Sequence, residues 1–290
     1  MSPFEAPRLR RSVQELIARG NKTLKKAGVL NPRLDTDLLL CASMGLTKEE
    51  LYCVLTQRVD DKAEKEFTDM LSLRERRCPV SYILGEREFW SLSFHVDPGV
   101  LIPRQETELV VETALQYGEP GMLILDVGTG SGCIAIALAS ELLESEVWAS
   151  DTSSEAIIIA RENVARHGLE ERVHVVKSDL LPPEPEEYDM IVSNPPYVSE
   201  QMWEDLMPEV RGFEPREALI PGPTGLELYP RLVEAAADRL APQGALILEI
   251  GIDQADEVSR IIGLQGFEIE QIVEDYGSIP RVIAARKLRE

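Results

Sequence analysis

One stretch of the sequence decides the fold: residues 122–132 read MLILDVGTGSG. Its first half is a short apolar run typical of a buried strand, and the apolar residues from Cys133 to Leu143 predict a helix directly after it. Glycines at such a turn let the backbone bend sharply and let a ligand approach the peptide groups. The stretch therefore predicts the ligand-binding turn of an α/β domain.

Strands and helices keep alternating after this turn. Such alternation predicts a parallel sheet with right-handed crossovers, and the last two strands predict an antiparallel pair that closes the chain. The strands are expected at residues 122–127, 146–150, 173–176, 190–193, 245–250, 267–273 and 281–286, and the helices at residues 133–143, 154–167 and 229–240.

The chain before residue 78 has a different, helical pattern. Ser12 with Glu15, and Thr47 with Glu50, have the spacing of capping boxes, which mark the starts of helices. A second helix is expected to begin at Asn31-Pro32. We expect that helix to turn Leu34, Leu38 and Cys41 inward and to end at Gly45, and a charged helix to run from Asp60 to Arg77.

A hairpin is expected between the two patterns. Trp90, Leu92, Phe94 and Val96 alternate with polar residues in the two-residue rhythm of a half-buried strand, and residues 81–84 would supply the partner strand. The expected division is a helical substrate-recognition domain over residues 1–78, a hairpin linker over 79–100 and a catalytic domain over 101–290.

The glycine turn consists of Gly128, Thr129, Gly130, Ser131 and Gly132. Its GxGxG spacing differs from the GxGxxG typical of folds that bind the pyrophosphate of a dinucleotide. The spacing favours a ligand without a diphosphate, such as S-adenosylmethionine. Asp151 ends the next strand, where a carboxylate suits the two ribose hydroxyls, and Asp179 follows the third strand, where an adenine amino group is expected.

The third motif is Asn194-Pro195-Pro196-Tyr197, directly after the strand at residues 190–193. The two prolines fix the backbone, so their carbonyls are presented rigidly beside the side-chain oxygen of Asn194. Acceptors held in this way grip both hydrogens of an NH2 group, and Tyr197 offers a flat face for a planar amide or base. The motif therefore predicts methylation of a planar NH2 nitrogen, with Asn194, Pro195 and Tyr197 as catalytic residues.

Composition limits the other possibilities. The net charge is -21, and residues 101–290 hold 36 acidic residues against 14 basic ones, which is a poor surface for nucleic-acid phosphates. The four cysteines have no metal-ligand spacing, and the three histidines have no evident partners, so no metal is expected. The first five residues form no apolar signal segment, and no apolar run is long enough to cross a bilayer. We therefore expect a cytoplasmic protein.

Several segments resemble one known family. The resemblance rests on YILGEREFW at residues 82–90, LIPRQETE at 101–108, the glycine turn, NPPY at 194–197, FEPREAL at 213–219 and DYGSIPRV at 275–282. Together these segments closely resemble the peptide chain release factor glutamine methyltransferases (HemK/PrmC), over nearly the whole chain.

The resemblance implies a Rossmann-like class I methyltransferase domain, with a mostly parallel seven-stranded sheet and an antiparallel final strand, after a small helical domain and a hairpin. It implies transfer of a methyl group from S-adenosyl-L-methionine, leaving S-adenosyl-L-homocysteine, to the glutamine amide (N5) of the Gly-Gly-Gln motif in release factors. The glycine turn, Asp151, Asp179, Leu180 and Asn194 would then bind the cofactor. The glutamine would be bound by Asn194, Pro195, Pro196, Tyr197 and Arg104.

Two residues depart from the family pattern. The family usually has proline where this chain has Gln105, and often a large aromatic residue where it has Leu180.

Four other functions are weighed against this one. A glutamine methyltransferase acting on a ribosomal protein would use the same pocket, and an adenine N6-methyltransferase shares NPPY but is disfavoured by the charge. A non-catalytic binding module of the same fold would be expected to lose the glycine turn, Asp151 or Asn194, all of which are present. The glycine spacing disfavours an NAD oxidoreductase.

Overall fold

The computed structural model describes residues 10–288, which form two compact units. Residues 10–85 and Pro208–Phe213 make up one unit, here called the helical unit, and the rest of the chain makes up the other, here called the sheet unit. The first five residues, on which the expectation about a signal segment rests, lie outside the described part. Within residues 10–288, no helix has both the length and the apolar character needed for a membrane span.

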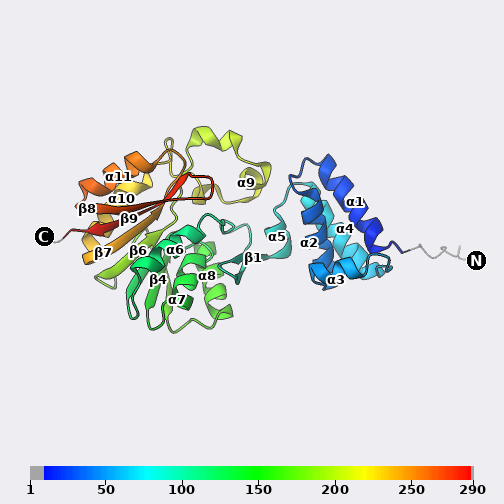
Figure 1. Ribbon diagram of the computed structural model, residues 1–290, viewed down its shortest axis with the longest axis horizontal. Helices are drawn as coiled ribbons and strands as arrows, with labels where there is room; N and C mark the ends of the chain where they lie inside the picture. Colours follow the sequence, from blue (N-terminus) through cyan, green and yellow to red (C-terminus); the bar gives the residue numbers. More distant parts are fainter. Residues whose placement is uncertain (1–9, 289–290) are drawn as a thin grey trace, which may run out of the picture. The chain divides into compact units, whose positions relative to one another are not determined.

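The helical unit has a small apolar core, built around Leu16, Leu39 and Phe67. Ser12 and Thr47 each form the expected capping box with the glutamate three residues later, and Asp60 caps the next long helix through two backbone amides. The helices are α1 (Val13–Lys26), α2 (Pro32–Met44), α3 (Lys48–Cys53), α4 (Asp61–Glu75), α5 (Val80–Leu84) and α9 (Pro208–Phe213) (Figure 1).

The inward face of α2 differs from the expected one. Leu34 and Leu38 are 44% and 37% exposed, whereas Leu39 and Leu40 are fully buried. The prediction that Leu34 and Leu38 face inward is wrong, and the prediction for Cys41 is confirmed. The inward face of α2 includes Asp35, whose carboxylate pairs with the buried guanidinium of Arg74 on α4, so a pattern of apolar residues alone does not identify this face.

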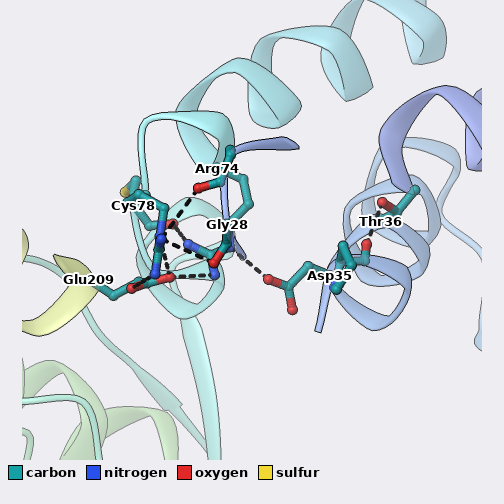
Figure 2. A network of polar contacts seen from close by, with 9 residues as sticks. Gly28, Asp35, Thr36, Arg74, Cys78 and Glu209 are labelled. Atoms are coloured by element: carbon teal, nitrogen blue, oxygen red, sulfur yellow. Dashed lines mark hydrogen bonds and ion pairs between the residues drawn. The ribbon is translucent and has the colours of Figure 1, made fainter. Parts of the chain in front are cut away.

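A buried ion-pair network joins α9 to α4 within the helical unit (Figure 2). The Arg74 guanidinium lies 2.7 Å from Asp35 and 2.8 Å from Glu209, and Arg77 lies 2.5 Å from the second oxygen of Glu209. Burial raises the pKa of Glu209, but hydrogen bonds from Arg77 and Arg74 outweigh it and hold the pKa below its ordinary value. Glu209 therefore shares one charged cluster with Arg77 and Arg74, which precede it by 132 and 135 positions in the sequence.

The hairpin lies at the start of the sheet unit and pairs β1 (Glu86–Phe89) with β2 (Leu92–His95). Trp90 and Ser91 form its turn, both with positive φ, so the expected strand placement of Trp90 is wrong. The partner strand expected at residues 81–84 is wrong as well, because that segment belongs to helix α5, which Gly85 ends in a left-handed conformation.

The sheet has the expected class I topology. Its strand order is β5-β4-β3-β6-β7-β9-β8, and β9 runs antiparallel to the other six strands. The strands are β3 (Leu123–Val127), β4 (Glu146–Asp151), β5 (Val173–Lys177), β6 (Tyr188–Ser193), β7 (Leu240–Glu249), β8 (Phe267–Glu274) and β9 (Pro280–Lys287) (Figure 1).

Each face of the sheet has its own core. Ile124 and Val192 point to one face and Leu125 and Ile191 to the other, as successive residues of a strand must. The first face is covered by α6 (Glu108–Tyr117), α7 (Cys133–Glu141) and α8 (Ser154–Arg166), and the second by α10 (Leu228–Arg239) and α11 (Ala255–Leu264). In such a sheet a ligand is expected at the carboxyl ends of the central parallel strands.

Candidate active site

The glycine turn joins the end of β3 to the start of α7. Gly128, Gly130 and Gly132 have φ values of +72°, +55° and +83°, which side chains with a Cβ atom rarely adopt. A Cβ atom added at Gly128 or Gly130 would meet nothing within 4 Å, so these two glycines border open space. Both line a cavity of about 290 Å³ in the sheet unit.

The other residues of the turn are buried beneath it. Thr129 donates its hydroxyl to Asp126 Oδ2 at 2.6 Å, and the carbonyl of Ser131 accepts from the side chain of Asn163. Burial raises the pKa of Asp126 to about 7. Thr129 and Ser131, at 5% and 2% exposure, therefore hold the shape of the turn.

Asp151 stands at the end of β4, facing the turn. Its Oδ2 accepts the Gly130 amide at 2.9 Å, and its Oδ1 accepts the Ser153 amide at 2.9 Å. Each carboxylate oxygen has two lone pairs, so the side chain is oriented by the backbone and keeps acceptor capacity toward the cavity that it lines.

The cavity brings most of the expected cofactor residues together. Asp179 and Leu180 line it, although the Asp179 carboxylate is exposed and pairs with Arg231 at 2.8 Å. Leu180 has a positive φ of 65°, and its carbonyl accepts the Ser150 hydroxyl. The lining residues are Gly99, Val100, Leu101, Gly128, Gly130, Asp151, Thr152, Ser153, Ala156, Ser178, Asp179, Leu180, Asn194, Pro196, Pro215, Glu217, Ala218, Leu228 and Arg231.

The NPPY segment begins where β6 ends, directly beside the glycine turn. Ser193 pairs with Val127 in the parallel register, and its hydroxyl donates to the Val127 carbonyl at 2.7 Å. This bond fastens the two strand ends together. Asn194 and Pro196 line the cavity, whereas Pro195 is buried.

Tyr197 is held from both ends. Its hydroxyl donates to Glu249 Oε1 at 3.0 Å, and its carbonyl accepts from Gln254 at 3.0 Å. Burial raises the pKa of Tyr197, and the neighbouring carboxylate of Glu249 raises it further. The tyrosine therefore stays neutral and fixed, with its hydroxyl directed at Glu249.

Arg104 pairs with a buried carboxylate. Its guanidinium lies 2.6 Å from Glu214, whose second oxygen accepts the Ile102 amide at 3.2 Å. The Arg104 side chain is 32% exposed, and its charge opposes a small part of the rise in the pKa of Tyr197. The residue expected to bind substrate is thus anchored near Tyr197 but does not line the cavity.

Comparisons with known proteins match both parts of the chain. The family of the methyltransferase small domain matches residues 104–209, and the family of the PrmC N-terminal domain matches residues 15–85.

Whole-chain relatives decide the family. A release factor glutamine methyltransferase of Fusobacterium nucleatum is 41% identical over 91% of this chain and 76% of its own length. One of Geobacter sulfurreducens is 40% identical over 91% of this chain and 92% of its own length. This chain belongs to the release factor glutamine methyltransferase family.

Solved structures agree with the fold of this family member. A methyltransferase from Pyrococcus furiosus superposes with a TM-score of 0.51 at 21% identity, covering 68% of this chain and 89% of that one. A ribosomal protein L11 methylase from Lactobacillus delbrueckii subsp. bulgaricus superposes with a TM-score of 0.50 at 22% identity, covering 67% and 84%. The class I methyltransferase fold is thereby confirmed.

Two residues beside the site of this family member were not found from the sequence. Thr107 accepts a hydrogen bond from the Asn194 side chain, and Glu249 accepts one from Tyr197. Thr107 lies within the LIPRQETE segment, and Glu249 ends an apolar strand. The signal for Glu249 was a charged residue at the carboxyl end of a parallel strand, where ligands bind.

Proposed function

We propose that this chain transfers a methyl group from S-adenosylmethionine to the side-chain amide nitrogen (N5) of the glutamine in the Gly-Gly-Gln motif of peptide chain release factors. Its relatives are release factor glutamine methyltransferases. One structural observation supports the chemistry most directly: Asn194 lines the same cavity as Gly128, Gly130 and Asp151. The cofactor loop and the amide-binding motif therefore meet at adjacent strand ends.

The residues present fit S-adenosylmethionine. The open space beside Gly128 and Gly130 admits a ligand against the backbone, and Asp151 keeps lone pairs for ribose hydroxyls. In this proposal Leu180 packs beside the adenine and Asp179 meets its amino group. S-adenosylmethionine supplies a methyl group that its sulfonium has already activated.

The chain's own residues then act on the glutamine. A primary amide nitrogen is a weak nucleophile, because its lone pair is delocalised into the carbonyl. Asn194 Oδ1 and the Pro195 carbonyl accept its two hydrogens and aim the nitrogen, while Tyr197 and Pro196 bound the plane of the amide. The nitrogen forms its bond to the methyl carbon as the bond between that carbon and the sulfonium sulfur breaks, which leaves S-adenosylhomocysteine, and one N–H proton leaves to water.

The proposed partner is a protein. The surplus of acidic residues in the catalytic part opposes a nucleic-acid substrate, and release factors are the partners of the family. Arg104, fixed by Glu214 near Tyr197, is proposed to contact the glutamine-bearing loop. Because release factors work in the cytoplasm, we place the enzyme there as well.

The experiment is methyl transfer with a labelled cofactor. The full chain is incubated with methyl-labelled S-adenosylmethionine and an unmethylated release factor, and the label is located by peptide mass spectrometry. A release factor with Gln→Asn in the Gly-Gly-Gln motif is the matched control. We expect label on that glutamine alone. Label only on a ribosomal protein, supplied in parallel, would overturn the partner, and no label on any protein would overturn the proposed function.

A further inference from the structure

A small group of buried polar side chains lies beside Asn194. Asn194 Nδ2 donates to Thr107 Oγ1 at 3.0 Å, across 87 residues of sequence. Thr107 is 2% exposed and precedes α6, where its side chain caps no helix amide. Its hydroxyl is therefore available to Asn194.

Glu249 stands behind Thr107 and Tyr197. It is 1% exposed, and its Oε1 accepts the Tyr197 hydroxyl at 3.0 Å. Its Oε2 has no hydrogen-bond partner among the described residues, and burial raises the pKa of Glu249 although hydroxyl groups nearby, those of Thr107 and Tyr197, oppose the rise. A hydroxyl has one proton and two lone pairs, so Thr107 accepts the Asn194 Nδ2 hydrogen and keeps its own proton free to donate elsewhere.

The hydrogen bond from Asn194 Nδ2 to Thr107 decides which way the Asn194 amide faces. The oxygen and nitrogen of an asparagine amide are nearly equal in shape, so packing does not distinguish the two orientations. Only hydrogen bonds do. Because Nδ2 is hydrogen-bonded to Thr107, Oδ1 is the polar atom of the amide that remains for the substrate. The reversed amide would turn the Asn194 NH2 group toward the NH2 group of the substrate. Both groups are hydrogen-bond donors, so no hydrogen bond would form between them.

We propose that Thr107 is a positioning residue, which orients the Asn194 amide so that Oδ1 is the acceptor offered to the substrate NH2 group. The role rests on the proposed function, because it concerns the same amide-binding site. Thr107 itself does not line the cavity, and it acts on the reaction through Asn194.

The test compares three variants of the full chain. Thr107→Val keeps the shape and removes the hydroxyl, and Thr107→Ser keeps the hydroxyl. Thr113→Val makes the same change at a 1% exposed threonine within α6, the helix that Thr107 precedes. We expect Thr107→Val to lower kcat about 10- to 100-fold, less than the loss of Asn194 itself, because an unoriented Asn194 amide still offers its acceptor part of the time. The Kd for S-adenosylhomocysteine should change less than about 2-fold, and the other two variants should retain kcat within about 3-fold.

A spectroscopic signal reports the amide without turnover. The chain has four asparagines, Asn21, Asn31, Asn163 and Asn194, so selective 15N-asparagine labelling yields few side-chain NH2 signals, and Asn194→Ala identifies the one of interest. In the wild type, one Asn194 Nδ2 proton should exchange slowly with solvent. That protection should vanish in Thr107→Val and persist in Thr107→Ser.

Three results would overturn the inference: unchanged kcat in Thr107→Val, an Asn194 signal unaffected by that change, or a loss of kcat matched by an equal loss of S-adenosylhomocysteine affinity. A wild-type protein that leaves release factor unmethylated would instead refute the proposed function. In that case the exchange behaviour of the Asn194 side-chain NH2 signal would still test whether Thr107 orients the Asn194 amide.

Discussion

At the residue scale, Asn194 combines a donor and an acceptor on one planar group, and the proposed reaction uses only the acceptor. Asn194→Ala removes it, so kcat should fall about 10²- to 10³-fold, the usual loss for one preorganised hydrogen-bonding group in a transition state. Binding of S-adenosylhomocysteine, followed by calorimetry, should weaken far less. Asn31→Ala, an exposed asparagine whose side chain caps no helix amide, is the control. Unchanged turnover in Asn194→Ala would contradict the assigned role of the motif.

Glu249 predicts a pH dependence of stability. Burial raises its pKa from 4.5 to about 7, opposed by the hydroxyls of Thr107 and Tyr197 and by the Arg281 charge, while the Glu106 charge adds to the rise. The folded state thus holds the proton more tightly than the unfolded state. This contribution is present below about pH 4.5 and is lost as the pH rises through 7.

Glu249→Gln removes that titration. Between pH 5 and 8 the wild type should lose on the order of 3 kcal/mol more unfolding free energy than the variant, measured by urea denaturation. Asp126, whose pKa burial also raises to about 7, is common to both proteins, so the difference isolates Glu249. Parallel pH profiles of the two proteins would mean that Glu249 is ionised throughout.

At the element scale, the loop before α10 is packed closely against the NPPY segment. Gly225 has a φ of +83°, and a Cβ atom there would collide with the Tyr197 carbonyl oxygen and lie 3.1 Å from the Gln254 amide. Gly225→Ala should therefore displace Tyr197 and lower kcat about 100-fold, since a shift of about 1 Å at a reacting group has that effect. The measurement is methyl transfer to release factor under saturating cofactor.

Gly263→Ala is the matched control for this change. Gly263 lies within α11 and has open space around it, so alanine should raise stability by up to about 1 kcal/mol and leave activity unaltered. Equal activity in the two variants would show that the Gly225 contact does not position Tyr197.

At the scale of the whole molecule, α9 belongs to the helical unit although its sequence neighbours belong to the sheet unit. Glu209 secures it through Arg74 and Arg77. Glu209→Gln leaves the buried guanidinium of Arg74 and the partly buried guanidinium of Arg77 without their shared negative charge, so the unit should lose about 3 kcal/mol. Hydrogen exchange of peptides covering α4 and α9 measures the loss.

Glu66→Gln on α4 makes the same change at an exposed ion pair and should cost less than about 1 kcal/mol. Because the pKa of Glu209 is lowered, its contribution should be retained above its ordinary value near 4.5 and lost as the pH falls below it. Equal exchange rates in the wild type and Glu209→Gln would refute the anchoring role.

The sequence by itself determined the alternating sheet, the glycine turn at residues 128–132 and the NPPY segment, because periodicity and short motifs are local properties of the chain. The local sequence pattern predicted the wrong structure where residues close together in the sequence compete for the same buried positions. Residues 81–84 fold as a helix that ends at Gly85, and Leu34 and Leu38 are exposed on α2, whereas Asp35 is buried. The assignment of domains to residues 1–78, 79–100 and 101–290 stays a prediction.

Only the tertiary structure decided how distant polar groups meet. Thr107 contacts Asn194 across 87 residues, Tyr197 contacts Glu249 across 52, and Arg74 contacts Glu209 across 135. No spacing rule covers such pairs, because each partner is brought into place by the packing of separate elements. A buried polar group must find a partner wherever the fold provides one, so the identity of that partner follows from the packing of the whole chain.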